Sequence, residues 1–196
     1  MTNLTFRCEC GQVEGSLTNA SPHTGNHMVC YCDDCQAYAA YLGDEDKWLD
    51  EWGGTDIFQV TPASITFLKG GDKLRCVRVK PGGIFRFYSS CCRTPIANTV
   101  SRKMPFAGIP SHIIHGNDKE AALGPVRCYV MGTYAKGQPP THPHPKFSLK
   151  SLVIVLGFVL KNKLKGANLP TPFFRDDGKA VVAPDPTLNP DNSARQ

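Results

Sequence analysis

The chain has few of the features that mark membrane, secreted or nucleic-acid-binding proteins. Its longest apolar run, Leu152 to Leu160, is far shorter than the roughly 20 residues of a membrane-spanning helix. The first residues, Met1 to Arg7, contain no apolar segment of the secretory-leader kind. Basic residues are scattered apart from three lysines near residue 163, so the net charge of +5 does not indicate a nucleic-acid partner. We expect a cytoplasmic protein without a transmembrane segment.

The chain does have many cysteines, and a composition typical of a folded domain. With 196 residues and 41% hydrophobic residues, it is suited to one packed domain with an appendage. It contains nine cysteines and no recognisable internal repeat. In the reducing cytoplasm, such cysteines are expected to be metal ligands or reactive thiols before they are disulfides.

Short runs of β-forming residues dominate the middle of the sequence. Turn signals rich in Gly and Pro separate them at regular spacing, which is typical of antiparallel sheets. The sequence therefore predicts a mostly β fold, with its clearest strands at 57–60, 64–68, 74–79 and 84–88. Residues 36–42 favour a short helix with Asp33 or Asp34 as its N-cap.

The C-terminal part follows a different pattern. Apolar residues recur at helical spacing from Phe147 to Lys165, so we predict an appended amphipathic helix. This helix is expected to pack on the domain or to form a homodimer, and its lysines also allow contact with a membrane surface. The predicted organisation is a β domain at 1–146, a helix at 147–166 and an extended or disordered tail at 167–196.

Seven of the cysteines form three groups whose spacing suits metal binding. The densest is C-x-C-x-x-C at Cys30, Cys32 and Cys35, where three thiolates can converge on one soft divalent ion. The other four cysteines of the three groups are then expected to form a four-thiol site, although the seven cysteines can also be divided between sites in other ways. A four-thiolate zinc site is closed and structural, whereas three protein ligands leave a position open. The four-thiol set is Cys8, Cys10, Cys91 and Cys92.

These motifs resemble the glutathione-dependent formaldehyde-activating enzyme family, whose domain also occurs in a centromere-associated protein. The resemblance rests on C-x-C-G at Cys8 to Gly11, C-x-C-x-x-C at Cys30 to Cys35, and Cys92-x-T-P ending at Pro95. The three motifs keep the family's order and separation, and the resemblance covers about residues 4 to 135.

The resemblance implies a fold, two metals and a reaction. The fold would be an Mss4-like zinc-binding β fold, with a structural zinc held by the first and last cysteine pairs. A second zinc, held by Cys30, Cys32 and Cys35, would be catalytic. There glutathione and formaldehyde would combine into S-hydroxymethylglutathione, which makes the protein a carbon–sulfur lyase with a thiol and a small aldehyde as partners. The alternative is a catalytically silent zinc-binding interaction module.

The chain departs from the family pattern beside the last pair. The family usually has C-x-x-C before G-T-P, whereas here Ser89 replaces the first cysteine and Arg93 replaces the glycine. Cys91 is the additional thiol. It can replace the missing ligand through a kinked turn, leave the structural site with three thiols and a weaker ligand, or close the middle site. We expect the first outcome. Cations near the motifs that suit an anionic thiol are Arg75, Arg78, Arg86 and Arg93.

Overall fold

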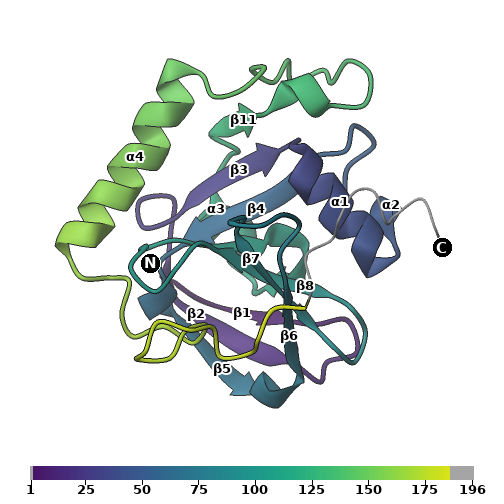
Figure 1. Ribbon diagram of the computed structural model, residues 1–196. Helices are drawn as coiled ribbons and strands as arrows, with labels where there is room; N and C mark the ends of the chain where they lie inside the picture. Colours follow the sequence, from purple (N-terminus) through teal and green to yellow (C-terminus); the bar gives the residue numbers. More distant parts are fainter. Residues whose placement is uncertain (1, 186–196) are drawn as a thin grey trace.

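The structure, a computed structural model, describes residues 2–185. Within this range the strands form a four-stranded sheet of order β10-β1-β2-β5 and a seven-stranded sheet of order β11-β3-β4-β9-β8-β7-β6 (Figure 1). The strands of the smaller sheet are β10 (Ile114–His115), β1 (Thr2–Arg7), β2 (Glu14–Ala20) and β5 (Ile65–Lys69). Those of the larger sheet are β11 (Cys128–Val130), β3 (Asn26–Cys30), β4 (Thr55–Val60), β9 (Ala107–Pro110), β8 (Pro95–Thr99), β7 (Phe85–Ser89) and β6 (Leu74–Val77).

The pairing of the strands confirms the prediction of a mostly β protein. The four strands expected between residues 57 and 88 correspond to β4, β5, β6 and β7. Neighbouring strands pair antiparallel, with the exception of β11, which runs parallel to β3. The larger sheet is therefore mixed.

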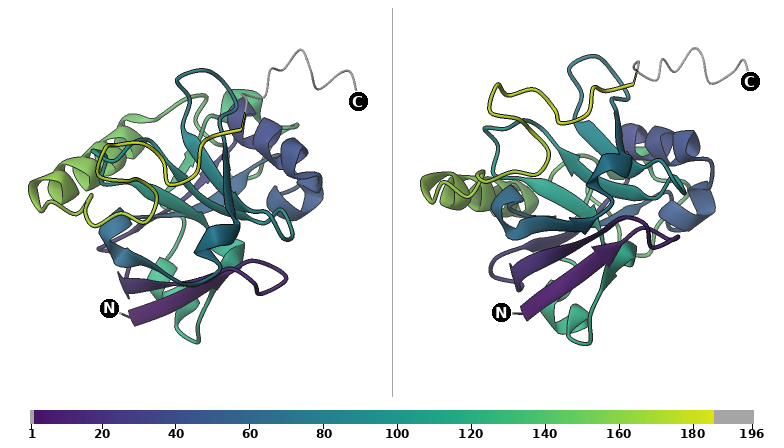
Figure 2. Two further views of the ribbon diagram at one scale, coloured as in Figure 1. Left: turned by 60° about the horizontal axis from the view of Figure 1, so that its bottom comes forward. Right: turned by 90° about the horizontal axis from the view of Figure 1, so that it is seen from below.

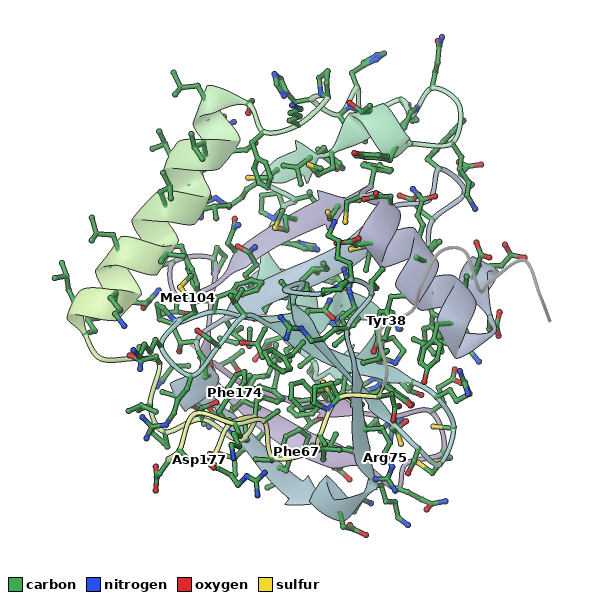
Figure 3. All side chains as sticks on the ribbon, in the orientation of Figure 1. Tyr38, Phe67, Arg75, Met104, Phe174 and Asp177 are labelled. Carbon is green, nitrogen blue, oxygen red and sulfur yellow. The ribbon has the colours of Figure 1, made fainter. Side chains whose placement is uncertain are left out.

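The two sheets pack face to face over the main hydrophobic core. Leu4 and Phe6 alternate with exposed neighbours along β1 and are buried against Phe58 and Phe87 of the other sheet. This alternation places one face of the smaller sheet in the core. Each such side chain contributes roughly 1.5–3 kcal/mol through burial. The side chains between the layers are drawn in Figure 3.

The segment after residue 167 also contributes to this core, which the sequence analysis did not predict. It is extended, as expected, but Phe173 is fully buried, and its ring lies 4.9 Å from that of Phe87. Phe174 packs edge-on against Phe85 at 5.2 Å. Figure 2 shows this segment, in yellow, running along the outside of the sheets. Two aromatic side chains therefore hold it in place. The rest of the predicted tail, residues 186–196, lies outside the described residues.

The helices lie at the periphery of the sheets. They are α1 (Asp33–Leu42), α2 (Glu45–Trp48), α3 (Lys119–Leu123) and α4 (Leu149–Leu164). The position of α4 confirms the appended helix, which packs along β3 and β11. The predicted N-cap of α1 is wrong: Cys32 occupies that position, and Asp33 and Asp34 form the first turn instead. In the described part of the chain, no helix is long and apolar enough to cross a membrane.

Candidate metal centres

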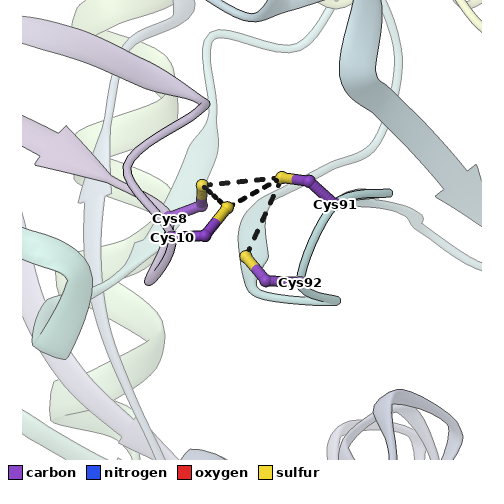
Figure 4. Close-up of side chains that lie close together, drawn as sticks. All are labelled: Cys8, Cys10, Cys91 and Cys92. Carbon is purple, nitrogen blue, oxygen red and sulfur yellow. Dashed lines mark hydrogen bonds between the residues drawn. The ribbon is translucent and has the colours of Figure 1, made fainter.

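Four thiols converge where two turns meet. Cys8 and Cys10 lie in the turn between β1 and β2, and Cys91 and Cys92 lie in the turn after β7 (Figure 4). The Sγ atom of Cys91 is 3.8 Å from that of Cys8, 3.2 Å from that of Cys10 and 3.9 Å from that of Cys92. Gly11, with φ of +70°, allows the first turn to double back. We call these residues the four-thiol group.

The spacing of the four-thiol group fits a tetrahedral metal. Zinc–sulfur bonds of about 2.3 Å place tetrahedral ligand atoms about 3.8 Å apart. The Sγ atoms of Cys8 and Cys10 are 3.6 Å apart, and all four sulfurs lie within 4.8 Å of one another. The backbone N–H of Val13 donates to Sγ of Cys8 at 3.2 Å. The group could therefore hold one metal ion.

Hydroxyl groups surround Cys92, including the serine that occupies the family's cysteine position. The Oγ of Ser89 lies 3.3 Å from Sγ of Cys92, and Oγ1 of Thr94 lies 3.1 Å from it. Burial raises the pKa of Cys92, but hydrogen bonds from these hydroxyls and from Cys10 lower it to about 6. Ser89 therefore supports a thiolate at a neighbouring position.

The turn after β7 is kinked at Arg93. Binding of one metal ion by both Cys91 and Cys92 would require such a kink. Arg93 has a φ of +55°, a conformation in which glycine is usual. Its side chain donates to the backbone oxygens of Tyr41 and Leu42 at the end of α1. This conformation directs Cys91 toward Cys8 and Cys10, as the first of the three alternatives requires. The role of Cys91 as a metal ligand stays a prediction.

Three further thiols meet at the N-terminus of α1. Cys30 ends β3, Cys32 is the N-cap of α1, and Cys35 lies in its first turn. Their sulfurs lie within 4.8 Å of one another, with Cys35 buried and the other two half-buried. The positive end of the helix macrodipole favours a thiolate here; the pKa of Cys35 is lowered, whereas hydrogen bonds to Cys32 and Cys35 raise that of Cys30. We call these residues the three-thiol group, and they could hold a second metal ion.

A buried arginine stands beside the three-thiol group. Nη1 and Nη2 of Arg86 donate to Sγ of Cys35 at 3.7 and 3.8 Å, and the guanidinium lies 5.2 Å from the ring centre of Tyr38. Arg86 is only 2% exposed. Hydrogen bonds from Cys30 and Cys32, together with the charge of Arg86, hold the pKa of Cys35 well below its ordinary value. A fully buried cation needs an anionic partner, and this thiolate supplies it.

The other three candidate arginines contact backbone oxygens. Nη1 of Arg75 donates to Leu74 at 2.8 Å, and Nε of Arg78 donates to Gly83 at 2.8 Å. Arg93 binds the end of α1, as described above. The four arginines were candidates because they lie near the motifs in the sequence. Of these four, the fold brings Arg86 to a sulfur.

The chain matches a family model over residues 2–184, nearly its whole described length. The chain belongs to this family. It is described as a family of unknown function, DUF6151. No curated protein matches the DUF6151 chain. A crystal structure of a Rhodobacter sphaeroides protein matches with a TM-score of 0.43 and 14% identity, covering 62% of this chain and 96% of that one. This likeness identifies neither the fold family nor the function of the DUF6151 chain.

A small cavity adjoins Cys35 on the inner side of α1. Its volume is about 10 Å³, which is room for about one water molecule. Arg86 and Tyr38 line it, together with Trp48, whose buried Nε1 has no hydrogen-bond partner in the described structure. Trp48 could not be predicted as part of this site, because only the packing of α2 against α1 brings it here.

The two remaining cysteines of the DUF6151 chain belong to the core. Cys76 and Cys128 are 0% and 1% exposed, and neither joins a thiol group. Burial raises the pKa of Cys76 to about 12. Both are therefore buried apolar thiols.

Proposed function

We propose that the chain is a zinc-dependent carbon–sulfur lyase or synthase of the glutathione-dependent formaldehyde-activating type, with an Mss4-like fold. The four-thiol group would hold a structural zinc, and the three-thiol group a catalytic zinc with one open position. One observation carries the proposal: three thiols and a buried Arg86 form a second centre, separate from a complete set of four. All nine cysteines are free, which suits a reducing compartment such as the cytoplasm.

The charge balance at the three-thiol group supports an anionic thiol as substrate. Three thiolates and one divalent ion leave a single negative charge, which the buried guanidinium of Arg86 offsets. A fourth thiolate, from the substrate, would therefore meet a nearly neutral centre. When bound, zinc would lower the pKa of a thiol in its open position and polarise a carbonyl.

The proposed reaction joins a thiol to a small aldehyde. The thiol sulfur bonds to the carbonyl carbon, the carbon–oxygen double bond becomes single, and the thiol proton ends on the oxygen. Arg86 and Tyr38 close the inner side of Cys35, and the cavity there is too small for glutathione. Access therefore lies on the side of Cys30 and Cys32, whose side chains are half-buried.

Metal content and thiol-dependent turnover test the proposal together. We expect two zinc ions per chain, four sulfur ligands at one and three at the other by X-ray absorption. Formaldehyde consumption should require glutathione, and it should be lost in Cys32→Ser while Cys76→Ala retains it. Four sulfurs at both ions, or no turnover with two ions bound, would rule the mechanism out.

A silent zinc-binding module is the second candidate. The observation that favours it is the cavity of about 10 Å³ beside Cys35, which encloses no room for a thiol substrate. In that case both metals would be structural. Cys32→Ser would then reduce stability as much as a change in the four-thiol group.

A further inference from the structure

A stripe of exposed apolar side chains runs along the whole length of α4. Its exposed residues recur every three or four positions, so they form one stripe on the solvent side. Leu156 is 56% exposed and Leu160 is 63% exposed. Such a row exceeds the scattered apolar residues usual on a surface. The stripe consists of Leu149, Leu152, Val153, Leu156, Leu160 and Leu164.

The inward face of α4 contacts the domain through both polar and apolar side chains. Its two buried residues are Ser151 and Asn162, and Ile154 packs on the small cluster formed by β3, β4 and β11. Nζ of Lys161 donates to the backbone oxygen of His23 at 3.3 Å, and Nζ of Lys163 donates to that of Lys103 at 2.6 Å. The orientation is therefore set by specific contacts, and it leaves the leucines outside.

The surrounding sequence is strongly basic. No Asp or Glu occurs from Ala121 to Arg175, a stretch that contains eight of the 22 basic residues. Elsewhere the other 14 basic residues are outnumbered by all 17 acidic ones. The lysines on α4 and at its end are Lys150, Lys161, Lys163 and Lys165. Lys161 and Lys163 contact backbone oxygens of the domain but remain exposed, and Lys150 and Lys165 are exposed as well, so positive charge borders the apolar stripe.

We propose that α4 docks on the surface of an anionic lipid bilayer, lying in the plane of the interface. A leucine stripe bordered by lysines has the chemistry that such a surface binds, apolar burial combined with attraction to acidic headgroups. With 16 residues the helix is about 24 Å long, shorter than the roughly 30 Å of a bilayer core. A second copy of the chain fits less well, because pairing α4 with itself brings lysines together.

Docking through α4 would not cover α1, whose N-terminus carries Cys32 and Cys35. In Figures 1 and 2, α4 and α1 lie at opposite sides of the molecule in every view. Lipid binding by α4 does not depend on the proposed zinc chemistry, and the two can be measured separately.

Flotation of the full chain with vesicles tests the proposal. Vesicles of phosphatidylcholine containing phosphatidylserine should bind the protein, whereas pure phosphatidylcholine should bind at least ~10-fold less, and added salt should weaken binding. Leu156→Ser with Leu160→Ser, and Lys150→Glu with Lys165→Glu, should each reduce binding at least ~10-fold. These side chains point outward, so the variants should keep the wild-type circular dichroism and unfolding midpoint.

Matched controls come from the rest of the surface. Leu68→Ser changes a leucine that is 60% exposed on β5, and Lys69→Glu with Lys179→Glu gives the same change in net charge. Both controls should bind as the wild type does. Failure of the wild type to bind anionic vesicles overturns the proposal, as does equal binding by the α4 variants. A dimer in sedimentation that Leu156→Ser dissociates, without lipid binding, would assign the stripe to a second copy instead.

Discussion

The two thiol groups differ in what surrounds the sulfurs. Around Cys92 the neighbours are hydroxyls and other thiols, and Cys91 supplies a fourth sulfur. In the three-thiol group the additional neighbour of Cys35 is the guanidinium of Arg86. A fourth thiolate completes the coordination of a metal, whereas a cation offsets charge without using a coordination position. Under the proposed function, this difference would make the four-thiol group a closed centre and the three-thiol group an open one.

The two groups are also joined through α1. The N-terminus of this helix carries Cys32 and Cys35, and its C-terminal end accepts hydrogen bonds from Arg93, next to Cys92. Metal binding is expected to stabilise the fold more at the four-thiol group than at the three-thiol group. The four-thiol group joins turns from both sheets, whereas the three-thiol group lies at one end of a helix.

The largest effect should follow loss of the four-thiol group. Cys91→Ser should release one metal and lower the free energy of unfolding by roughly 3 kcal/mol or more, since binding of a structural metal is coupled to folding. Urea unfolding and metal analysis measure this, with Cys76→Ala as the control. An unchanged midpoint with both metals retained would contradict the role of Cys91.

Loss of the three-thiol group should affect activity far more than stability. Cys32→Ser should release the other metal and reduce thiol-dependent aldehyde consumption at least ~100-fold, because the open position is lost. Its unfolding free energy should fall by less than that of Cys91→Ser. Equal destabilisation by both variants would show that both centres are structural.

Arg86 should influence only the three-thiol group. Arg86→Met keeps much of the volume and removes the charge, so metal affinity there should fall roughly 10–100-fold. Competition with a coloured chelator measures this, and Arg86→Lys should recover part of the affinity. The four-thiol group should retain its metal in both variants, and a loss from both centres would point to general unfolding.

Arg93 combines an unfavourable φ with favourable contacts to α1. Arg93→Ala keeps the φ of +55° and removes the contacts to Tyr41 and Leu42, so stability should fall by about 1–2 kcal/mol. Arg93→Gly also removes them but relieves the φ, so it should lose less. Thermal unfolding of both variants compares the two effects, and a glycine variant less stable than the alanine one would contradict the strain.

The smallest expected effect is a pH dependence of stability, and it arises at His27, outside both thiol groups. Nε2 of His27 is 2.7 Å from Oδ1 of Asp56, and Nδ1 is 2.8 Å from the oxygen of Gly124. Burial lowers the pKa of His27, but these hydrogen bonds outweigh it and raise the pKa above its ordinary value. The stabilisation is therefore full below about pH 6.5 and is lost as pH rises through the folded-state pKa.

Unfolding at pH 6 and pH 8 checks this contribution. The wild type should lose more stability over that interval than Asp56→Asn, which removes the carboxylate partner. Identical losses in the two proteins would show that His27 is not charged in the folded state.

Much of the fold and the thiol sets could be predicted, because they depend on local patterns. Alternation of apolar residues predicted β4 to β7, and helical spacing predicted α4. Segments held by distant partners could not be predicted this way: nothing local in Phe173 and Phe174 shows that they fill the core beside Phe87 and Phe85. Likewise, the position of the N-cap at Cys32 depends on where β3 ends in the folded protein.

By itself, the sequence determined which thiols stand close enough along the chain to share an ion, because C-x-C-x-x-C in a turn leaves few other arrangements. Only the tertiary structure decided where Cys91 points, since the kink at Arg93 is held by contacts to a distant helix. It also decided that Arg86 faces Cys35 and that the leucines of α4 face outward. These outcomes depend on pairs of residues far apart in sequence, which periodicity and spacing do not specify.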